Sequence, residues 1–359
     1  MREICIHGHF YQPTRVNPWT NHLEPQPSAA PFQDWNERVT AECYAPNTAA
    51  RLLDGEGHTR ATRNTYNAIN FDFGPTLLTW LEKNHPVVIE QLRIADRDSI
   101  AAFGKGSAIA QPYHHPILPL CDERDKATEV RWGLSVFERI FERPAEGMWL
   151  PETAVDTPTL EALAEEGLSF VLLAPNQIEA IQDSKGTWIE ATENEGANRA
   201  FKIELPSGKS ISAVVYDAVV SRGVAFEGLL HNGEQFAQRL DETSLHTGLA
   251  LIATDGESYG HHHTHGDMAL AYAQEQIEAR SDCRLTNVAS WLSRNPAKTL
   301  ARIKEKTSWS CAHGLGRWTD DCGCKMDAAR GWHQEWREPL RKALEALRDE
   351  ARAALDPVA

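Results

Sequence analysis

The sequence predicts an α/β fold, a barrel of seven βα units followed by a short helical C-terminal extension. Three observations lead to this prediction: the length of 359 residues, the alternation of short apolar runs with segments of helical period, and clusters of polar residues after four of those runs. A barrel of βα units uses about 250 residues as one domain. We therefore assign residues 1–300 to the barrel and residues 301–359 to a loop rich in Cys, His and Trp and a helical segment.

Seven apolar or β-branched runs are predicted to be strands, because each is short and is separated from the next by a longer segment. In chain order they span residues 3–7, 66–71, 107–111, 147–150, 168–173, 211–216 and 249–254.

The segments between these runs carry helix patterns at 76–83, 86–94, 123–142, 157–166 and 267–280. Asp156 and Thr157 before Pro158 form an expected helix start, with a capping residue and proline in the first turn. Residues 184–212 break the alternation. Their Gly-Thr-Trp and Pro-Ser-Gly-Lys stretches predict a β-hairpin insertion on one loop.

The composition limits the classes of partner. Lys and Arg number 36 against 51 Asp and Glu, and the resulting net charge of -15 disfavours nucleic acid and anionic membrane surfaces. No stretch approaches the ~20 apolar residues of a membrane span. The start of the chain has no signal-peptide pattern, and four of the seven cysteines lie far apart, which is typical of reduced thiols. We expect a cytoplasmic protein.

Polar runs follow the first, third, fourth and seventh predicted strands. Since catalytic groups of parallel barrels come from the C-terminal ends of the strands, these runs are expected to meet at one rim. Two acids from separate strands, Glu152 and Asp255, lie among His and aromatic residues, a combination that suits glycoside hydrolysis. The apolar faces for stacking sugar rings would come from Trp149, Trp309 and Trp318. For any one of these acids, a salt bridge or a helix cap is the simpler interpretation.

The four runs resemble the ordered motifs of glycoside hydrolase family 57. They are a His-rich run ending in Gln12-Pro13, a Tyr/His-Pro run at 113–116, Trp-Leu-Pro-Glu at 149–152, and Asp-Gly-Glu-Ser-Tyr-Gly at 255–260. A fifth motif containing Trp is placed at Thr307 to Ser310. The resemblance covers roughly residues 1–310. The first motif departs from the common form, since Phe10 and Tyr11 separate His9 from Gln12.

The resemblance implies a retaining enzyme on an incomplete barrel of seven βα units that acts on α-glucan, as an α-amylase, 4-α-glucanotransferase or branching-type enzyme, without a cofactor. Glu152 would be the nucleophile and Asp255 the general acid/base, so the first step requires Glu152 ionised and Asp255 protonated. Substrate contacts are predicted for a larger set at the strand ends: His7, His9, Gln12, Tyr113, His115, Trp149, Asp217, Arg222, Glu257, His261 and Trp309. Among these, Glu257 is expected to support its neighbours by hydrogen bonds.

Two other classes stay open. The histidines at 261, 262, 263 and 265 beside Asp255, with His7 and His9 on the first strand, also fit a metal site. That interpretation would make the chain a metal-dependent carbohydrate deacetylase or an α-mannosidase-like enzyme, neither of which would need Glu152 in its place. The third class is a non-catalytic glycan-binding protein.

A second candidate metal site lies in the C-terminal segment. Cys311, His313, Cys322 and Cys324 provide four zinc-type ligands, although Cys-x-Cys is tighter than the usual spacing, and a glycine-rich loop packed near the barrel mouth is the simpler interpretation. After this loop, apolar residues recur at helical spacing from Trp336 to Leu355, which predicts an amphipathic helix that docks onto the barrel.

Overall fold

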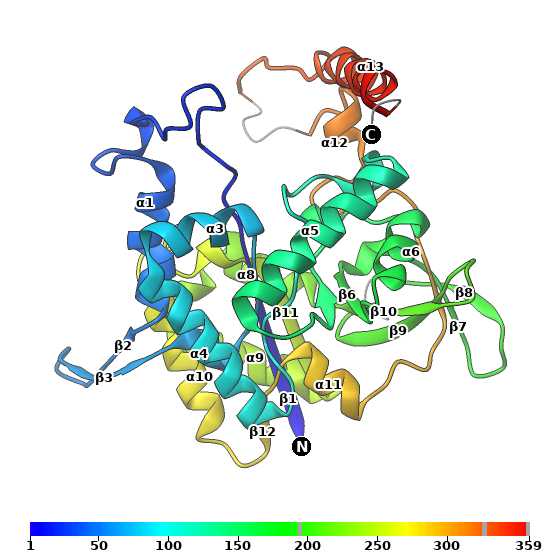
Figure 1. Cartoon of the computed structure of the whole chain (residues 1–359). Coiled ribbons are helices and arrows are strands. Elements are labelled where there is room, and N and C mark those ends of the chain that lie inside the picture. The colour runs from blue at the N-terminus through cyan, green and yellow to red at the C-terminus, as the bar shows by residue number, and fades with distance from the viewer. Residues whose placement is uncertain (193–195, 325–328, 357–359) are drawn as a thin grey trace.

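A computed structural model describes residues 1–192, 196–324 and 329–356, and shows an α/β protein with β1 near its centre (Figure 1). The strands are β1 (Arg2–Phe10), β2 (Ala50–Leu53), β3 (Thr59–Arg63), β4 (Asn70–Phe73), β5 (Gly147–Met148), β6 (Phe170–Leu173), β7 (Ile178–Gln182), β8 (Trp188–Glu190), β9 (Arg199–Glu204), β10 (Ser210–Val215), β11 (Leu249–Asp255), β12 (Cys283–Leu285) and β13 (Ala301–Ile303). The predicted α/β class is confirmed.

The helices cover the strands and fill the connections between them. They are α1 (Trp35–Val39), α2 (Ala45–Asn47), α3 (Pro75–Asn84), α4 (Pro86–Phe103), α5 (Glu123–Phe141), α6 (Thr157–Glu165), α8 (Ala218–Phe226), α9 (Gly233–Thr247), α10 (Gly266–Glu278), α11 (Val288–Arg294), α12 (Gly316–Thr319) and α13 (Arg337–Leu355). Asp156 accepts a hydrogen bond from the backbone N–H of Thr159, so the predicted start of α6 is confirmed.

The strands found at the predicted runs pair with one another in parallel. β1 pairs with β11, β4 and β12, and β6 pairs with β5 and β10. Between these groups, single parallel bridges link Phe71 to Ala108 and Ala110 to Met148. Two details differ from the prediction. The run at 66–71 starts as a 3-10 turn (Thr65–Ala68), and the run at 107–111 takes part through isolated bridges.

Antiparallel pairs occupy the region of the predicted hairpin insertion. β7 pairs with β8, and β9 pairs with β10, so β10 belongs to both a parallel and an antiparallel pair. β13, which begins at residue 301, pairs with β7. The segment after residue 300 is therefore paired with β7, the strand that comes just before the predicted insertion.

Successive side chains of β1 point to opposite faces of the sheet, and the two faces have different surroundings. Ile4, Ile6 and Phe10 are buried in the main apolar core. Cys5 belongs to a second apolar cluster together with Trp149, and His7 and His9 follow it at intervals of two. The strand thus presents its imidazoles on the face opposite the main core residues.

α13 lies at the end of the molecule farthest from the N-terminus in Figure 1. Its contacts with the start of α5 are ionic, since Arg352 binds both Asp122 and Asp125. Leu344 and Leu347 of its apolar stripe are 57% and 62% exposed, but Leu340 and Leu344 line a hollow together with Leu120 and Trp318. Docking of this helix through its apolar stripe therefore stays a prediction. Among the described residues, no helix has the length and apolarity needed to cross a bilayer.

Candidate active site

Glu152 follows β5 in a short turn, Pro151–Thr153, with left-handed backbone angles of φ 57° and ψ 20°. Such a conformation costs a non-glycine residue about 1–3 kcal/mol and is concentrated at functional sites. The carboxylate accepts hydrogen bonds at Oε2 from Trp309 Nε1 at 3.0 Å and from Ser310 Oγ at 2.5 Å. The backbone N–H of Trp309 also donates to the carbonyl of Glu152 at 3.1 Å. Two donors therefore stabilise and orient the Glu152 carboxylate.

Asp255 ends β11, next to β1, where it is in register with His9. The residue is solvent-exposed, although the protein around it desolvates its carboxyl group. This desolvation raises the pKa of Asp255, and the negative charges of Glu152 and Asp72 raise it further, against an opposing effect of His9. Asp255 therefore holds a proton more firmly than an ordinary aspartate, as a general acid requires.

A buried carboxylate, Asp72 on β4, holds the two histidines of β1. Its Oδ2 accepts from His9 Nδ1 at 2.8 Å, and its Oδ1 lies 3.1 Å from His7 Nε2, where the geometry falls short of a hydrogen bond. Asn70 Nδ2 donates to His7 Nδ1 at 2.7 Å. The parallel register of β1 and β4 sets the contact between His7 and Asn70 and that between His9 and Asp72, because each histidine lies opposite its partner.

A hydrogen bond joins the rings of His9 and His115. Their Nε2 atoms are 3.0 Å apart, and the rings are stacked with centroids 5.1 Å apart. Burial opposes protonation of His9, but the charge and hydrogen bond of Asp72 raise its pKa to about 9. Burial and the positive charge of His9 lower the pKa of His115 to about 3. His9 is thus the charged donor and His115 the neutral acceptor at neutral pH.

Trp149 lies beneath these histidines. Its ring stacks on His7 and His9 at 4.8 Å and 4.9 Å, and it is fully buried. The prediction that Trp149 offers a face to a sugar ring is therefore wrong, because imidazoles occupy that face. Trp318 also lies away from Glu152, in a hollow that α13 lines. Of the three tryptophans expected to stack on sugar, only Trp309 reaches Glu152.

Glu257, two residues after Asp255, is buried. Its Oε1 accepts from the Tyr44 hydroxyl at 2.6 Å and from the backbone N–H of Tyr11 at 3.2 Å. Burial and the charge of Asp255 raise its pKa to about 7. Both contacts are with protein groups, in line with the hydrogen-bonding support expected of it, although that role stays a prediction.

Three other predicted contacts lie at the margin of the site. The side chain of Gln12 accepts from Arg15 at 2.5 Å. Tyr113 packs edge to face on Trp132 of α5. His261 Nδ1 is 2.5 Å from a carboxylate oxygen of Glu42. Their contact with substrate stays a prediction.

Asp217 and Arg222 have structural partners. Asp217 caps α8 by accepting from the backbone N–H groups of Val219 and Val220, each at 3.0 Å. Arg222 is exposed and pairs with Glu227 at 2.8 Å. The structure therefore gives both residues the ordinary roles of a helix cap and a surface ion pair, and a role in binding substrate is a prediction that neither contact requires.

The histidines after Asp255 do not converge on it. His263 Nε2 contacts the carbonyl of Ala225 at 3.0 Å, His265 sits in the left-handed turn before α10, and His261 faces Glu42. Within the described ranges, the group of at least three His, Cys or acidic side chains with metal-compatible spacing is Cys311, His313, Cys322 and Cys324. The metal site proposed around Asp255 thus has no matching ligand set there.

Sequence reasoning missed the roles of two residues. Asp72 is buried, and its carboxylate lies against His7 and His9. The contact of Ser310 with Glu152 was not foreseen, although Ser310 lies in the tryptophan motif. The contact of Asp72 depends on the register between β4 and β1, which the local sequence does not show, and for Ser310 the sequence offers only its place next to Trp309.

Comparison with known proteins shows the family of this chain. The sequence model of "Glycosyl hydrolase family 57" matches residues 13–304. An α-amylase of Dictyoglomus thermophilum is 31% identical over 106 residues, which are 29% of this chain and 15% of the relative. The chain thus spans a small part of that relative.

Solved structures show the same fold at lower identity. A maltose-forming exo-amylase from Pyrococcus sp. ST04 superposes with a TM-score of 0.68 at 16% identity, covering 97% of this chain and 62% of the other. A 4-α-glucanotransferase from Thermococcus litoralis gives a TM-score of 0.63 at 16% identity, covering 86% and 42%. Because the family model covers most of the sequence, the chain belongs to glycosyl hydrolase family 57.

Proposed function

We propose that this chain is a retaining glycoside hydrolase or transglycosylase that acts on α-glucan, with Glu152 as nucleophile and Asp255 as general acid/base. The observation that carries the proposal is the unequal environment of the two acids. Glu152 accepts hydrogen bonds from two donors, whereas the pKa of Asp255 is raised. This difference is what the first step of a retaining mechanism needs.

In the proposed reaction, Glu152 attacks the anomeric carbon while Asp255 gives its proton to the departing glycosidic oxygen. A covalent glycosyl-enzyme ester forms and the aglycone leaves as an alcohol. Asp255, now ionised, then takes a proton from a water molecule or a sugar hydroxyl. The oxygen of that acceptor attacks the anomeric carbon and releases the carboxylate of Glu152. Hydrolysis and transfer share these steps and differ only in the acceptor.

We infer that the parallel strands form the incomplete seven-unit barrel. A hydrogen bond of 2.7 Å from the backbone N–H of Asp217, just beyond β10, to the carbonyl of Leu251 on β11 supports a return of the strand order toward β1. The catalytic unit would extend past residue 300, because Trp309 and Ser310 contact Glu152. The predicted cytoplasmic location rests on the cysteine pattern and stays a prediction.

The relatives' names support an α-glucan substrate, since they include an α-amylase and a 4-α-glucanotransferase. The decisive experiment incubates the protein with maltooligosaccharides and follows product length and anomeric form by NMR. Products of retained configuration are expected. Inverted products would exclude the covalent mechanism, and absence of turnover on every α-glucan tried would exclude the substrate class.

Trapping the intermediate tests Glu152 itself. A 2-deoxy-2-fluoro-glucosyl fluoride is expected to label the wild-type protein at Glu152, identified by peptide mass spectrometry. Glu152→Gln should give no ester and no detectable turnover. Asp255→Asn is expected to lower turnover by about 10²–10⁴-fold on substrates with poor leaving groups, the contribution of a general acid. Label on any other residue would refute the assignment.

A further inference from the structure

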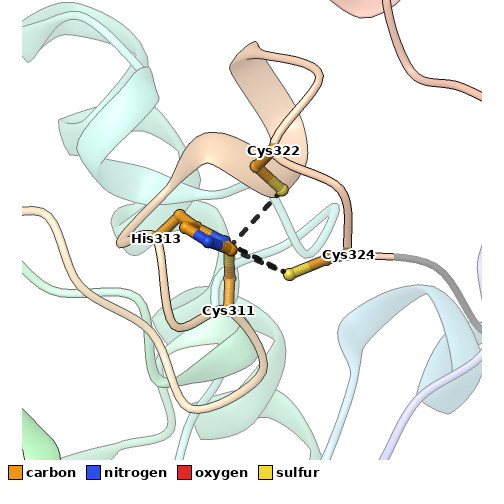
Figure 2. A group of neighbouring side chains, drawn as sticks. All are labelled: Cys311, His313, Cys322 and Cys324. Atoms are coloured by element: carbon orange, nitrogen blue, oxygen red, sulfur yellow. Dashed lines mark hydrogen bonds between the residues drawn. The ribbon is translucent and has the colours of Figure 1, made fainter.

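Four metal-ligand side chains converge in the loop around α12. Cys311 and His313 precede this short helix, and Cys322 and Cys324 follow it (Figure 2). Their donor atoms all lie within 4.8 Å of one another. These residues lie beyond 304, where the match to the family ends. They form a second polar centre, separate from the carboxylates of the active site.

Three of the separations between donor atoms are close to the edges of a zinc tetrahedron. Cys311 Sγ is 3.9 Å from both Cys322 Sγ and Cys324 Sγ, and Cys324 Sγ is 3.5 Å from His313 Nδ1. With Zn–S bonds of about 2.3 Å and Zn–N bonds of about 2.0 Å, tetrahedral geometry places two sulfurs about 3.8 Å apart and a sulfur and a nitrogen about 3.5 Å apart. A disulfide would need about 2.05 Å between two sulfurs, and the three cysteines are free thiols.

We propose that Cys311, His313, Cys322 and Cys324 bind one Zn²⁺ ion as a closed structural site. Three thiolates and one imidazole fill all four positions, which leaves none for a substrate or a water molecule. Soft sulfur ligands in a tetrahedral arrangement select zinc over the oxygen-seeking cations Mg²⁺ and Ca²⁺.

Glycines make the tight Cys-x-Cys spacing workable. Gly323 stands between Cys322 and Cys324 with φ +82°, a left-handed conformation that lets both sulfurs turn toward Cys311. At Gly314, with φ +69°, an added Cβ would lie 2.6 Å from the carbonyl oxygen of Lys306. The loop therefore depends on glycine to fold back on itself.

The site is adjacent in sequence to the donors that hold Glu152. Cys311 follows Ser310 directly, and Arg317 from α12 donates to the Ser310 carbonyl at 3.3 Å. Ser308 donates from its hydroxyl to the Gly314 carbonyl at 3.0 Å. A zinc ion bound here would fix the loop that carries Trp309 and Ser310, so the ligands act as positioning residues. This consequence rests on the proposed function, whereas zinc binding does not.

The test measures metal directly. Protein purified without added metal or chelator is expected to contain about one zinc per chain by inductively coupled plasma mass spectrometry. Cys322→Ser and Cys324→Ser are the variants of choice, because Cys311 adjoins Ser310 and changing it would disturb the Glu152 contacts. Cys121→Ser, a half-buried free cysteine outside the cluster, is the matched control and should keep its zinc.

A second measurement avoids reliance on variants that fail to fold. Wild-type protein stripped of metal and given Co²⁺ should show the visible bands of tetrahedral cobalt and the near-ultraviolet charge-transfer band of thiolate ligands. Metal-free wild type without those bands on cobalt addition would overturn the proposal, as would full zinc content in both Cys→Ser variants. Neither outcome depends on glucan turnover, so failure of the zinc proposal is distinct from failure of the proposed function.

Discussion

At the scale of single residues, the site is built from pairs that fix each other's charge. Asp72 keeps His9 protonated, and His9 in turn keeps His115 neutral. On the other side, Ser310 and Trp309 direct two donors at one oxygen of Glu152. Each pair joins residues far apart in sequence, so the role of either residue cannot be predicted from its local sequence.

Removal of one donor to Glu152 is expected to slow catalysis. Ser310→Ala deletes a hydrogen bond to a charged group, an interaction worth about 1.5–3 kcal/mol, so kcat should fall by roughly 10- to 100-fold. The measurement is steady-state turnover of a maltooligosaccharide. Ser169→Ala, which removes a hydroxyl that contacts only the Glu146 carbonyl among described partners, should retain wild-type kcat. Equal rates for Ser310→Ala and wild type would count against the role of Ser310.

The His9–Asp72 pair is expected to make stability depend on pH. The folded pKa of His9 is about 9, above its ordinary value of 6.5. Its contribution to the free energy of unfolding is therefore complete below pH 6.5 and is lost as the pH rises through 9, by on the order of 3 kcal/mol.

Urea unfolding between pH 6.5 and 9.5 measures this decline. Wild type should lose stability across the window, and His9→Asn should lack that component, while the exposed His58→Asn should behave as wild type. An identical slope for His9→Asn and wild type would contradict the assigned charge.

At the scale of elements, close packing at one glycine joins α5 to the site. A Cβ added at Gly133 would lie 2.1 Å from the carbonyl oxygen of Gln111, at the end of the run that leads to His115. The nearest atoms belong to the backbone of Gln111 and Pro112, so no side chain could move aside to make room for the added Cβ. The contact fixes the distance between α5 and the polar run that follows the third predicted strand.

Gly133→Ala is expected to destabilise the protein by about 1–3 kcal/mol, the usual cost of overpacking. Thermal unfolding should show a lower Tm for this variant. Gly55→Ala provides the control, because nothing lies within 4 Å of its added Cβ and its φ is not positive. A Tm unchanged by Gly133→Ala would mean that α5 can shift without cost.

Much of the element order was predictable, and the failures have physical causes. Helices α5 and α6 begin with aspartate caps and α3 begins with a proline, and the predicted bounds of all three lie close to those observed. β12 and β13 were missed because each has three residues, too few to show an alternating pattern. The roles of Asp72 and Ser310 depend on register and on long-range contact, neither of which is written in local sequence.

At the scale of the whole molecule, the proposed active site depends on the segment after residue 300. β13 pairs with β7, and the side chains of Trp309 and Ser310 donate hydrogen bonds to Glu152. α13, by contrast, contacts the start of α5 through ion pairs and buries no residue of its own. The two parts of the C-terminal segment thus differ in their importance for the proposed catalysis.

A pair of truncations separates these parts. A chain that ends after residue 332 lacks α13 but keeps β13, Trp309, Ser310 and the four proposed zinc ligands, so we expect it to retain most of its turnover. A chain that ends after residue 300 should have no measurable turnover, because Glu152 loses both side-chain donors. Turnover assays with circular dichroism as a folding check give the comparison. Turnover by the chain that ends after residue 300 would refute the dependence on Trp309 and Ser310.

The alternation along β1 has a consequence for how this family can change over time. Ile4, Ile6 and Phe10 face the main core, whereas Cys5, His7 and His9 occupy the intervening positions. A substitution on the core side leaves the imidazoles in place, but gain or loss of a single residue within the strand would exchange the two faces. Descendants of this sequence can therefore vary β1 in composition far more readily than in length.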